Sequence, residues 1–337
     1  MIKVALIGAG KMELSHLSIL GAHDAVEVVG VSDTSGLIMD VLKKFTAFPC
    51  FTDYEEMLKK TRPDAVFVAA PTRFHSKIIK HVLNEGKHVF SEKPLCLTQD
   101  EGEELVNLAL KKQLVNQVGY PNKFIVTFQE VKKIISNGHL GKIFHFTGES
   151  YGPVVIRDKQ DTWRSDPKEG GGCLLDYASH VIDLINYILG PISKVKGSIL
   201  KSFYSKNVED SVFSLLELAS NVSGVLLVNW SDETYRKMST SLTILGSKGK
   251  IICDAQELKA YFKTSSCPDN YSKGWNVKYI TDLTDSVDFY LRGEEYSAQI
   301  DYFIKAINKE VPNSINDFKS SWNTDRVISL IKNSGNK

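Results

Sequence analysis

The sequence predicts an α/β protein in which a doubly wound parallel sheet is followed by a second, mostly antiparallel open sheet. Over the first third of the chain, short apolar runs alternate with segments of helical periodicity, which is typical of parallel strands joined by helical crossovers. In the second half, strand patterns follow one another with only short turns between them, which favours antiparallel pairing. The length of 337 residues exceeds one ordinary domain, so we expect two, residues 1–120 and 121–337.

The elements of the first half follow from the apolar runs and from the residues that bound them. Thr98 with Glu101 three residues later, for example, is a capping-box pattern that predicts the start of a helix. The expected strands are residues 3–7, 26–31, 48–51, 65–69, 87–91 and 114–118. The expected helices are residues 11–20, 36–45, 53–61, 73–85 and 98–112, followed after the domain boundary by residues 126–135.

The second half is predicted to hold one buried helix and a sheet. Residues 170–190, GGGCLLDYASHVIDLINYILG, are apolar around most of a helical circumference. The expected strands are residues 195–204, 211–218, 223–230, 239–245 and 249–253, and a polar loop at 261–279 precedes closing helices at 296–308 and 318–331. We expect Phe203, Phe213 and Trp230 to make the outer sheet face too apolar for water, so a homodimer or homotetramer would cover it.

The composition is that of an ordinary globular protein, with 42% hydrophobic and 24% charged residues. Lys plus Arg number 41 against 40 Asp plus Glu, so no net charge directs the chain to nucleic acid or anionic lipid. We find no secretory leader pattern and no apolar stretch of about 18 residues, so we expect a cytoplasmic protein with no membrane partner. The five cysteines lack C-x-x-C spacing, so neither a disulfide framework nor a metal site is predicted.

A glycine turn and an acidic residue indicate a dinucleotide site. Gly8-Ala9-Gly10 follows the first strand and opens a helix, and such glycines let a pyrophosphate approach backbone N–H groups. Asp33 ends the second strand, where it can accept ribose hydroxyls and repel a 2′-phosphate, so NAD is favoured over NADP. An Asp beside Thr and Ser can also simply form a turn. Glu13 stands where the fingerprint has glycine or alanine, so we expect weaker cofactor binding.

Ligands bind to such a sheet at the carboxyl ends of its strands. The residues at these ends that we expect to contact the cofactor are Gly8, Gly10, Lys11, Met12, Asp33, Ala70, Pro71, Thr72, His75, Glu92 and Lys93. Lys93 lies in the sequence Glu92-Lys93-Pro94, and a desolvated lysine near a nicotinamide can polarise a substrate oxygen or lower the pKa of a neighbouring base. In another position the same tripeptide is typical of a surface turn.

Three polar residues lie on one stripe of the apolar helix at 170–190. Asp176, His180 and Asp183 are spaced i, i+4 and i+7. Burying such groups without partners costs roughly 1 to 3 kcal/mol each, so each needs a partner or a ligand. We interpret this helix as the floor of an active site. The alternative is a core histidine with its own partners, flanked by aspartates on the helix surface.

Four motifs occur in order, namely GAG-K-M with His16 after it, APT-R-F-H ending at His75, E-K-P around Lys93, and GGG-x-L-x-D-x-x-x-H-x-x-D. Over essentially its whole length the chain resembles the glucose–fructose oxidoreductase, inositol dehydrogenase and rhizopine-catabolism (GFO/IDH/MocA) family. The resemblance implies an N-terminal Rossmann domain that binds NAD or NADP and a C-terminal domain for substrate and oligomer contacts. It also implies that Lys93, Asp176 and His180 are the catalytic residues.

Aromatic and cationic residues near these motifs suit a polyol ring that carries a negative group. The expected substrate-binding residues are Lys93, Tyr120, Lys123, Tyr151, Trp163, Arg164, Asp176, Tyr177 and His180. The segments around Tyr151 and Trp163 resemble those of family members that oxidise nucleotide-linked sugars. Alternatively, these residues brace the loop at 152–169.

We therefore expect NAD-dependent hydride transfer between nicotinamide and a secondary alcohol or ketone of a sugar, a cyclitol or a nucleotide-linked sugar. In this mechanism His180 takes the hydroxyl proton and Lys93 stabilises the developing alkoxide. Asp176 binds an adjacent hydroxyl or orients the imidazole. The alternative is a non-catalytic, dinucleotide-sensing regulator, because fold does not determine function. Such a regulator would have no reason to keep all three residues.

Overall fold

The computed structural model describes residues 1–157, 162–284 and 294–335. The chain divides into two compact units. The first contains Met1–Pro121 with Val287–Trp322, and the second contains Asn122–Ser286 with Asn323–Lys337. The expected division into domains 1–120 and 121–337 stays a prediction about which parts fold independently.

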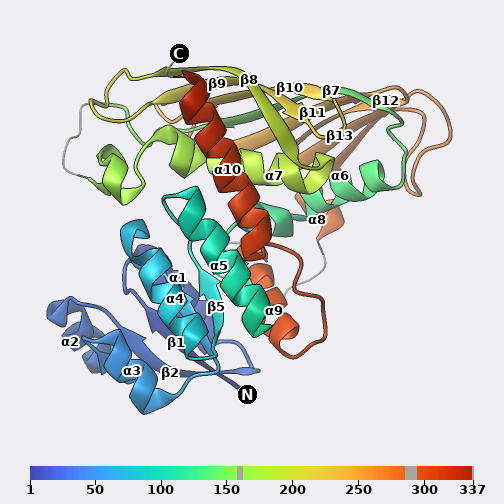
Figure 1. Ribbon diagram of the computed structural model, residues 1–337. Coiled ribbons are helices and arrows are strands. Elements are labelled where there is room, and N and C mark those ends of the chain that lie inside the picture. The colour runs from blue at the N-terminus through green and yellow to red at the C-terminus, as the bar shows by residue number, and fades with distance from the viewer. Residues whose placement is uncertain (158–161, 285–293, 336–337) are drawn as a thin grey trace. The chain divides into compact units, whose positions relative to one another are not determined.

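A six-stranded parallel sheet forms the centre of the first unit, in the order β3-β2-β1-β4-β5-β6 (Figure 1). The strands are β1 (Ile2–Ile7), β2 (Val26–Ser32), β3 (Cys50–Phe51), β4 (Ala65–Val68), β5 (His88–Ser91) and β6 (Asn116–Val118). The strand order reverses direction between β1 and β4, which is where ligands bind in doubly wound sheets. The predicted parallel sheet is confirmed.

Helices cover both faces of this sheet because successive side chains of β1 point to opposite sides. Val4 and Leu6 pack into the core beneath α1 (Lys11–Gly21), α2 (Gly36–Phe45) and α9 (Glu294–Ile307). Ala5 and Ile7 pack into the core beneath α3 (Tyr54–Thr61), α4 (His75–Asn84) and α5 (Gln99–Lys112). The capping box predicted at Thr98 is present at the start of α5. The apolar cores on the two faces hold the sheet, and with it the carboxyl ends of its strands, in place.

An eight-stranded sheet forms the second unit, in the order β14-β13-β12-β11-β7-β10-β9-β8. Its strands are β7 (Ile143–Tyr151), β8 (Ile192–Lys201), β9 (Ser211–Leu218), β10 (Ser223–Asn229), β11 (Ser239–Gly246), β12 (Gly249–Asp254), β13 (Glu257–Phe262) and β14 (Gly274–Tyr279). β7 and β10 are parallel neighbours, and the other neighbouring pairs are antiparallel. The predicted mostly antiparallel sheet is therefore confirmed.

The other α-helices are α6 (Val126–Ser136), α7 (Ser179–Leu189), α8 (Ile280–Leu283) and α10 (Phe318–Gly335). Helices α6 and α7 pack on one face of the second sheet (Figure 1). Gly148 of β7 makes room for this packing, since a Cβ there would lie 2.7 Å from Val181 and 2.8 Å from Ile185. Among the helices of the described ranges, none combines the length and the apolar character needed to cross a membrane.

One expectation for the second sheet was wrong. Residues 261–279 are not one polar loop, because β13 ends within them and β14 pairs with β13. The side chains of β14 alternate between half-buried and exposed, so no buried face marks it as a strand. Strand β7, which lies between β11 and β10, was also not expected. Its neighbours are distant in sequence, so its pairing depends on the tertiary fold.

The outer face of the second sheet is apolar in part, but Trp230 does not belong to it. Trp230 is fully buried, and its Nε1–H donates to Oδ1 of Asp210 at 2.7 Å. The expectation for Trp230 was therefore wrong, because the residue continues the alternation of β10 on the same inner side as Leu226 and Val228. Phe213 and Ile199 are 43% and 56% exposed and face each other across β9 and β8. Phe203, at 61%, is exposed as well.

Candidate active site

The turn after β1 has room for a phosphate only because it lacks side chains. Gly8 has a φ of +111°, and a Cβ built there would lie 2.7 Å from the carbonyl oxygen of Ala69. The next helix, α1, has Gly10 as its N-cap, with no side-chain cap hydrogen bond. Backbone N–H groups at such a helix start attract anions. The turn therefore fits the pyrophosphate of a dinucleotide.

Asp33 lies next to this turn, at the end of β2. Its Oδ2 accepts a hydrogen bond from the N–H of Ala9 at 2.9 Å, and its Oδ1 accepts one from the N–H of Ser35 at 2.8 Å. A carboxylate oxygen has two lone pairs, so both oxygens can still accept ribose hydroxyls. Both the glycine turn and the acid thus fit NAD, and the chain's own backbone holds the acid in place.

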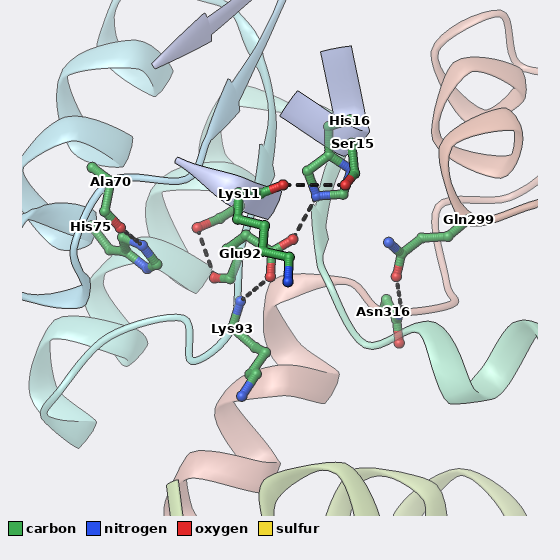
Figure 2. Close-up of polar contacts among 10 residues, drawn as sticks. Lys11, Ser15, His16, Ala70, His75, Glu92, Lys93, Gln299 and Asn316 are labelled. Atoms are coloured by element: carbon green, nitrogen blue, oxygen red, sulfur yellow. Dashed lines mark hydrogen bonds and ion pairs between the residues drawn. The ribbon is translucent and has the colours of Figure 1, made fainter. Parts of the chain in front are cut away.

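Glu92, which is partly buried, pairs with the buried His16 at the end of β5. His16 Nε2 lies 2.6 Å from Glu92 Oε1, and the N–H of Lys93 donates to Glu92 Oε2 at 3.4 Å. Burial would raise the pKa of Glu92, but the hydrogen bond from His16 and the positive charges of His16 and Lys93 lower it overall. Figure 2 shows the Lys93 side chain extending away from this pair. The pair therefore anchors the backbone of Lys93 while its ammonium group points elsewhere.

His75 connects two of the strand ends that we expected at the cofactor. Its Nδ1 lies 2.9 Å from the carbonyl oxygen of Pro94, and its Nε2 lies 2.8 Å from that of Ala70 (Figure 2). Burial lowers the pKa of this imidazole, and the two carbonyl oxygens oppose that shift. His75 thus holds the turn after β4 to the turn after β5, where the Lys93–Pro94 peptide bond is cis. Its expected contact with the cofactor stays a proposal.

The segment that contains Asp176 and His180 is buried, as predicted, but it is not one regular helix. Leu174–Ala178 forms a π-helical turn, and α7 begins at Ser179. Asp176 is therefore on the π turn and His180 on the α-helix, and they are 8% and 7% exposed. Such π turns are rare and are frequent at functional sites. The change of helix type lies between the two candidate catalytic residues.

Glu209 holds the start of this segment, and sequence reasoning missed it. Its Oε1 accepts a hydrogen bond from the N–H of Leu174 at 2.9 Å. A Cβ built on Gly172, which has a φ of +107°, would lie 2.4 Å from the same oxygen. Burial raises the pKa of Glu209, and the Leu174 N–H opposes that shift. The glycine run thus admits a carboxylate of the chain itself, 35 residues away in sequence, which no local pattern could reveal.

Arg164 contacts Asp176. Its Nε donates to Asp176 Oδ2 at 2.9 Å, and its guanidinium lies over the ring of Trp163, 4.4 Å from the centroid. Arg164 is 37% exposed and Trp163 is 46% exposed, so both could still contact a ligand. Among the candidate substrate residues, these two are thus placed together with Asp176.

Lys123 and Asp183 form a buried ion pair. Lys123 Nζ lies 2.8 Å from Asp183 Oδ1, and their side chains are 3% and 1% exposed. Thr324 Oγ1 donates to the same oxygen at 3.4 Å. Burial raises the pKa of Asp183, whereas Lys123 and Thr324 lower it. Asp183 therefore has a partner within the core. The expected contact of Lys123 with substrate stays a proposal.

The three candidate tyrosines lie in different surroundings. Tyr120 is fully buried in the first unit, where Asn316 Nδ2 donates to its carbonyl oxygen at 2.7 Å. Tyr151 stacks on Tyr235 with ring centroids 5.6 Å apart, and burial with nearby Glu149 raises its pKa to about 12. Tyr177 is 3% exposed, and burial raises its pKa. Their expected contact with substrate stays a proposal.

Comparisons with known proteins agree with this architecture. Residues 2–120 match the family described as an oxidoreductase family with an NAD-binding Rossmann fold, and residues 128–252 match the GFO/IDH/MocA C-terminal domain. The myo-inositol 2-dehydrogenase of Thermotoga maritima is 25% identical over 262 residues, 75% of this chain and 75% of that protein. The D-glucoside 3-dehydrogenase of Escherichia coli is 27% identical over 235 residues, 64% of this chain and 66% of that protein. A levoglucosan dehydrogenase solved with NADH superposes with a TM-score of 0.87 at 21% identity, over 99% of this chain and 97% of that one.

The Lys123–Asp183 pair yields a stability prediction. Lys123→Met leaves Asp183 buried without its counter-charge, so it should lower the free energy of unfolding of the second unit by about 3 to 5 kcal/mol. Combining it with Asp183→Leu should recover most of that loss, because no charge remains buried. Urea unfolding followed by tryptophan fluorescence measures both.

Lys194→Met is the matched control, because Lys194 is 60% exposed and pairs with Glu217 at 2.9 Å on the surface. It should change the unfolding free energy little. Equal losses in Lys194→Met and Lys123→Met would contradict the assigned importance of the buried pair.

Proposed function

This chain belongs to the GFO/IDH/MocA family and is an NAD-dependent oxidoreductase of the sugar dehydrogenase type, and we propose that its substrate is the secondary alcohol or ketone of a sugar, a cyclitol or a nucleotide-linked sugar. The names of two relatives support this, because D-glucoside 3-dehydrogenase and myo-inositol 2-dehydrogenase both denote oxidation of a ring hydroxyl. The observation that carries the proposal is that Asp176 and His180 lie on a buried π turn and the α-helix after it. The same chain also has the glycine turn and Lys93.

The proposed mechanism assigns one role to each residue. NAD, held by the glycine turn and Asp33, supplies the nicotinamide that accepts the hydride. His180 takes the proton of the substrate hydroxyl as general base. Lys93 hydrogen-bonds the same oxygen, so its positive charge stabilises the alkoxide character that develops. Asp176, held by Arg164 at 2.9 Å, binds an adjacent hydroxyl or orients the imidazole.

We also propose that the protein is a homodimer or homotetramer that associates through the outer face of the second sheet, and that it works in the cytoplasm. Support for the assembly comes from the exposed apolar row formed by Ile199, Phe213 and Leu215, at 56%, 43% and 54% exposure. Contiguous apolar surface of this kind is usually covered by a partner.

Asp33 should select NAD over NADP. Asp33→Ser removes the negative charge that repels a 2′-phosphate, so the ratio of the NADP to the NAD dissociation constant should fall about tenfold. The ratio is informative because losing the hydrogen bonds to Ala9 and Ser35 would weaken both dinucleotides alike. Fluorescence titration with NADH and NADPH measures it. An unmodified protein that prefers NADP by tenfold, about 1.4 kcal/mol, would refute this role.

His180 and Lys93 should be needed for turnover but not for cofactor binding. His180→Asn and Lys93→Met should lower kcat/KM by roughly 10² to 10⁴ and leave the NADH dissociation constant unchanged. The unmodified enzyme's kcat/KM for alcohol oxidation should rise with pH through one ionisation, because the base must be neutral. The assays use NAD with myo-inositol, D-glucosides and UDP-sugars.

The controls are His145→Asn and Lys77→Met, the same substitutions at exposed positions. If His180→Asn or Lys93→Met turned over within a few-fold of its control, that residue would not be a catalyst. Turnover by the unmodified protein also separates a dehydrogenase from a non-catalytic regulator.

Light scattering should give a mass of two or four chains at micromolar concentration. Leu215→Lys should shift that mass toward the monomer, because it places a charge in the apolar row. Leu37→Lys is the matched control, since Leu37 is 77% exposed on α2 of the first unit. A monomeric unmodified protein would remove the proposed assembly.

A further inference from the structure

The glycine turn is partly covered by a side chain of the same chain. Glu13 lies in the first turn of α1. Its Oε2 is 2.8 Å from where a Cβ of Gly10 would lie, and its Cγ is 3.2 Å from where a Cβ of Gly8 would lie. The absent side chain of Gly10 therefore leaves a space that the Glu13 carboxylate enters, whereas at Gly8 the nearest atom is the carbonyl oxygen of Ala69. This is the space that the glycines otherwise leave for a pyrophosphate.

The Glu13 side chain also occupies one of the backbone N–H groups at the start of α1. The Glu13 carboxylate accepts a hydrogen bond from its own backbone N–H. Gly10, the N-cap, contributes no side-chain cap, so Glu13 supplies the acid that favours the start of α1. Glu13 thus places its own carboxylate at a helix start that attracts anions.

The charges around Glu13 are mainly acidic. Burial raises the pKa of its carboxyl, and the carboxylates of Glu92 and Asp33 raise it further. Its own N–H and the imidazole of His16 act in the opposite direction. Two other carboxylates, those of Glu92 and Asp33, and the basic imidazole of His16 thus act on the charge of Glu13 at the start of α1.

We propose that the carboxylate of Glu13 is an internal competitor for the pyrophosphate of NAD, so that the dinucleotide binds well only when this carboxyl takes up a proton. The inference rests on the proposed function, because it takes the turn as the NAD site. It makes Glu13 the residue that sets cofactor affinity in this chain. Binding then takes up protons, so NAD affinity rises as the pH falls.

The first test is cofactor affinity in the full-length protein. Glu13→Gln keeps the size of the side chain and removes its charge, and Glu13→Ala removes the competitor altogether. Both should lower the NADH dissociation constant at pH 8 on the order of tenfold. Glu13→Gln should not lower the melting temperature at pH 8, because the raised pKa of Glu13 means that the folded protein disfavours this carboxylate. A general folding defect would lower both the melting temperature and the affinity for NADH, so these two measurements together exclude it.

Glu27→Gln is the matched control, because Glu27 is exposed at the opposite end of the same sheet, near the start of β2. It should leave NADH binding unchanged. Two fragments locate the effect, since ADP-ribose carries the pyrophosphate and adenosine does not. Glu13→Gln should tighten ADP-ribose like NADH and leave adenosine unaffected.

The second test is the number of protons taken up on binding, measured by calorimetry in buffers with different ionisation heats. The unmodified protein should take up a fraction of a proton with NADH near pH 6, and Glu13→Gln should take up less. Because Glu13→Gln retains His16, Asp33 and Glu92, the difference reports Glu13 alone.

Unchanged or weaker NADH binding in both Glu13 variants would overturn the inference, as would equal proton uptake with and without the Glu13 carboxyl. If neither the unmodified protein nor any variant bound NADH or NADPH, the proposed function itself would fail. The two failures are thus distinguishable in one titration series.

Discussion

The hydrogen bond between His16 and Glu92, 2.6 Å long, joins the two parts of the first unit on which the chemistry depends. His16 belongs to the helix that follows the glycine turn, and Glu92 precedes the candidate catalytic lysine. The ionisation of Glu92 and the position of His16 depend on each other in this partly buried contact. The lowered pKa of Glu92 keeps its carboxylate charged, and that charge holds the imidazole. The position of the phosphate-binding turn relative to the backbone of Lys93 follows from this one contact.

In the second unit, polar groups lie inside an apolar core. Three acids there have partners from other segments: Lys123 for Asp183, Arg164 for Asp176, and the N–H of Leu174 for Glu209. Buried charges of this kind contribute little to net stability but are costly to break. They therefore favour one packing of the π turn against α7. A reactive imidazole on that helix needs the fixed position that this packing gives it.

Much of the fold could be predicted because its signals are local. The alternation of apolar runs and capped helices located the parallel sheet, and the glycine turn with Asp33 located its functional edge. Strand β14 could not be found in this way, because its pairing uses backbone groups while its side chains face water. Nor could Glu209, since its contact with Leu174 depends on the tertiary fold. Trp230 was assigned to the wrong face, because it continues the alternation of β10 on the inner side, after Leu226 and Val228, and donates to Asp210 there.

The central claim is that the first unit binds NAD and that the chain uses it on a ring polyol. Thermal unfolding with NADH or NADPH, each alone and with myo-inositol, D-glucosides or UDP-sugars, tests both halves of it. A ligand at 100 times its dissociation constant stabilises the folded state by about 2.7 kcal/mol, which such a measurement resolves. We predict that NADH raises the melting temperature more than NADPH, and that at least one polyol raises it further when the cofactor is present. No shift with either dinucleotide would contradict the account.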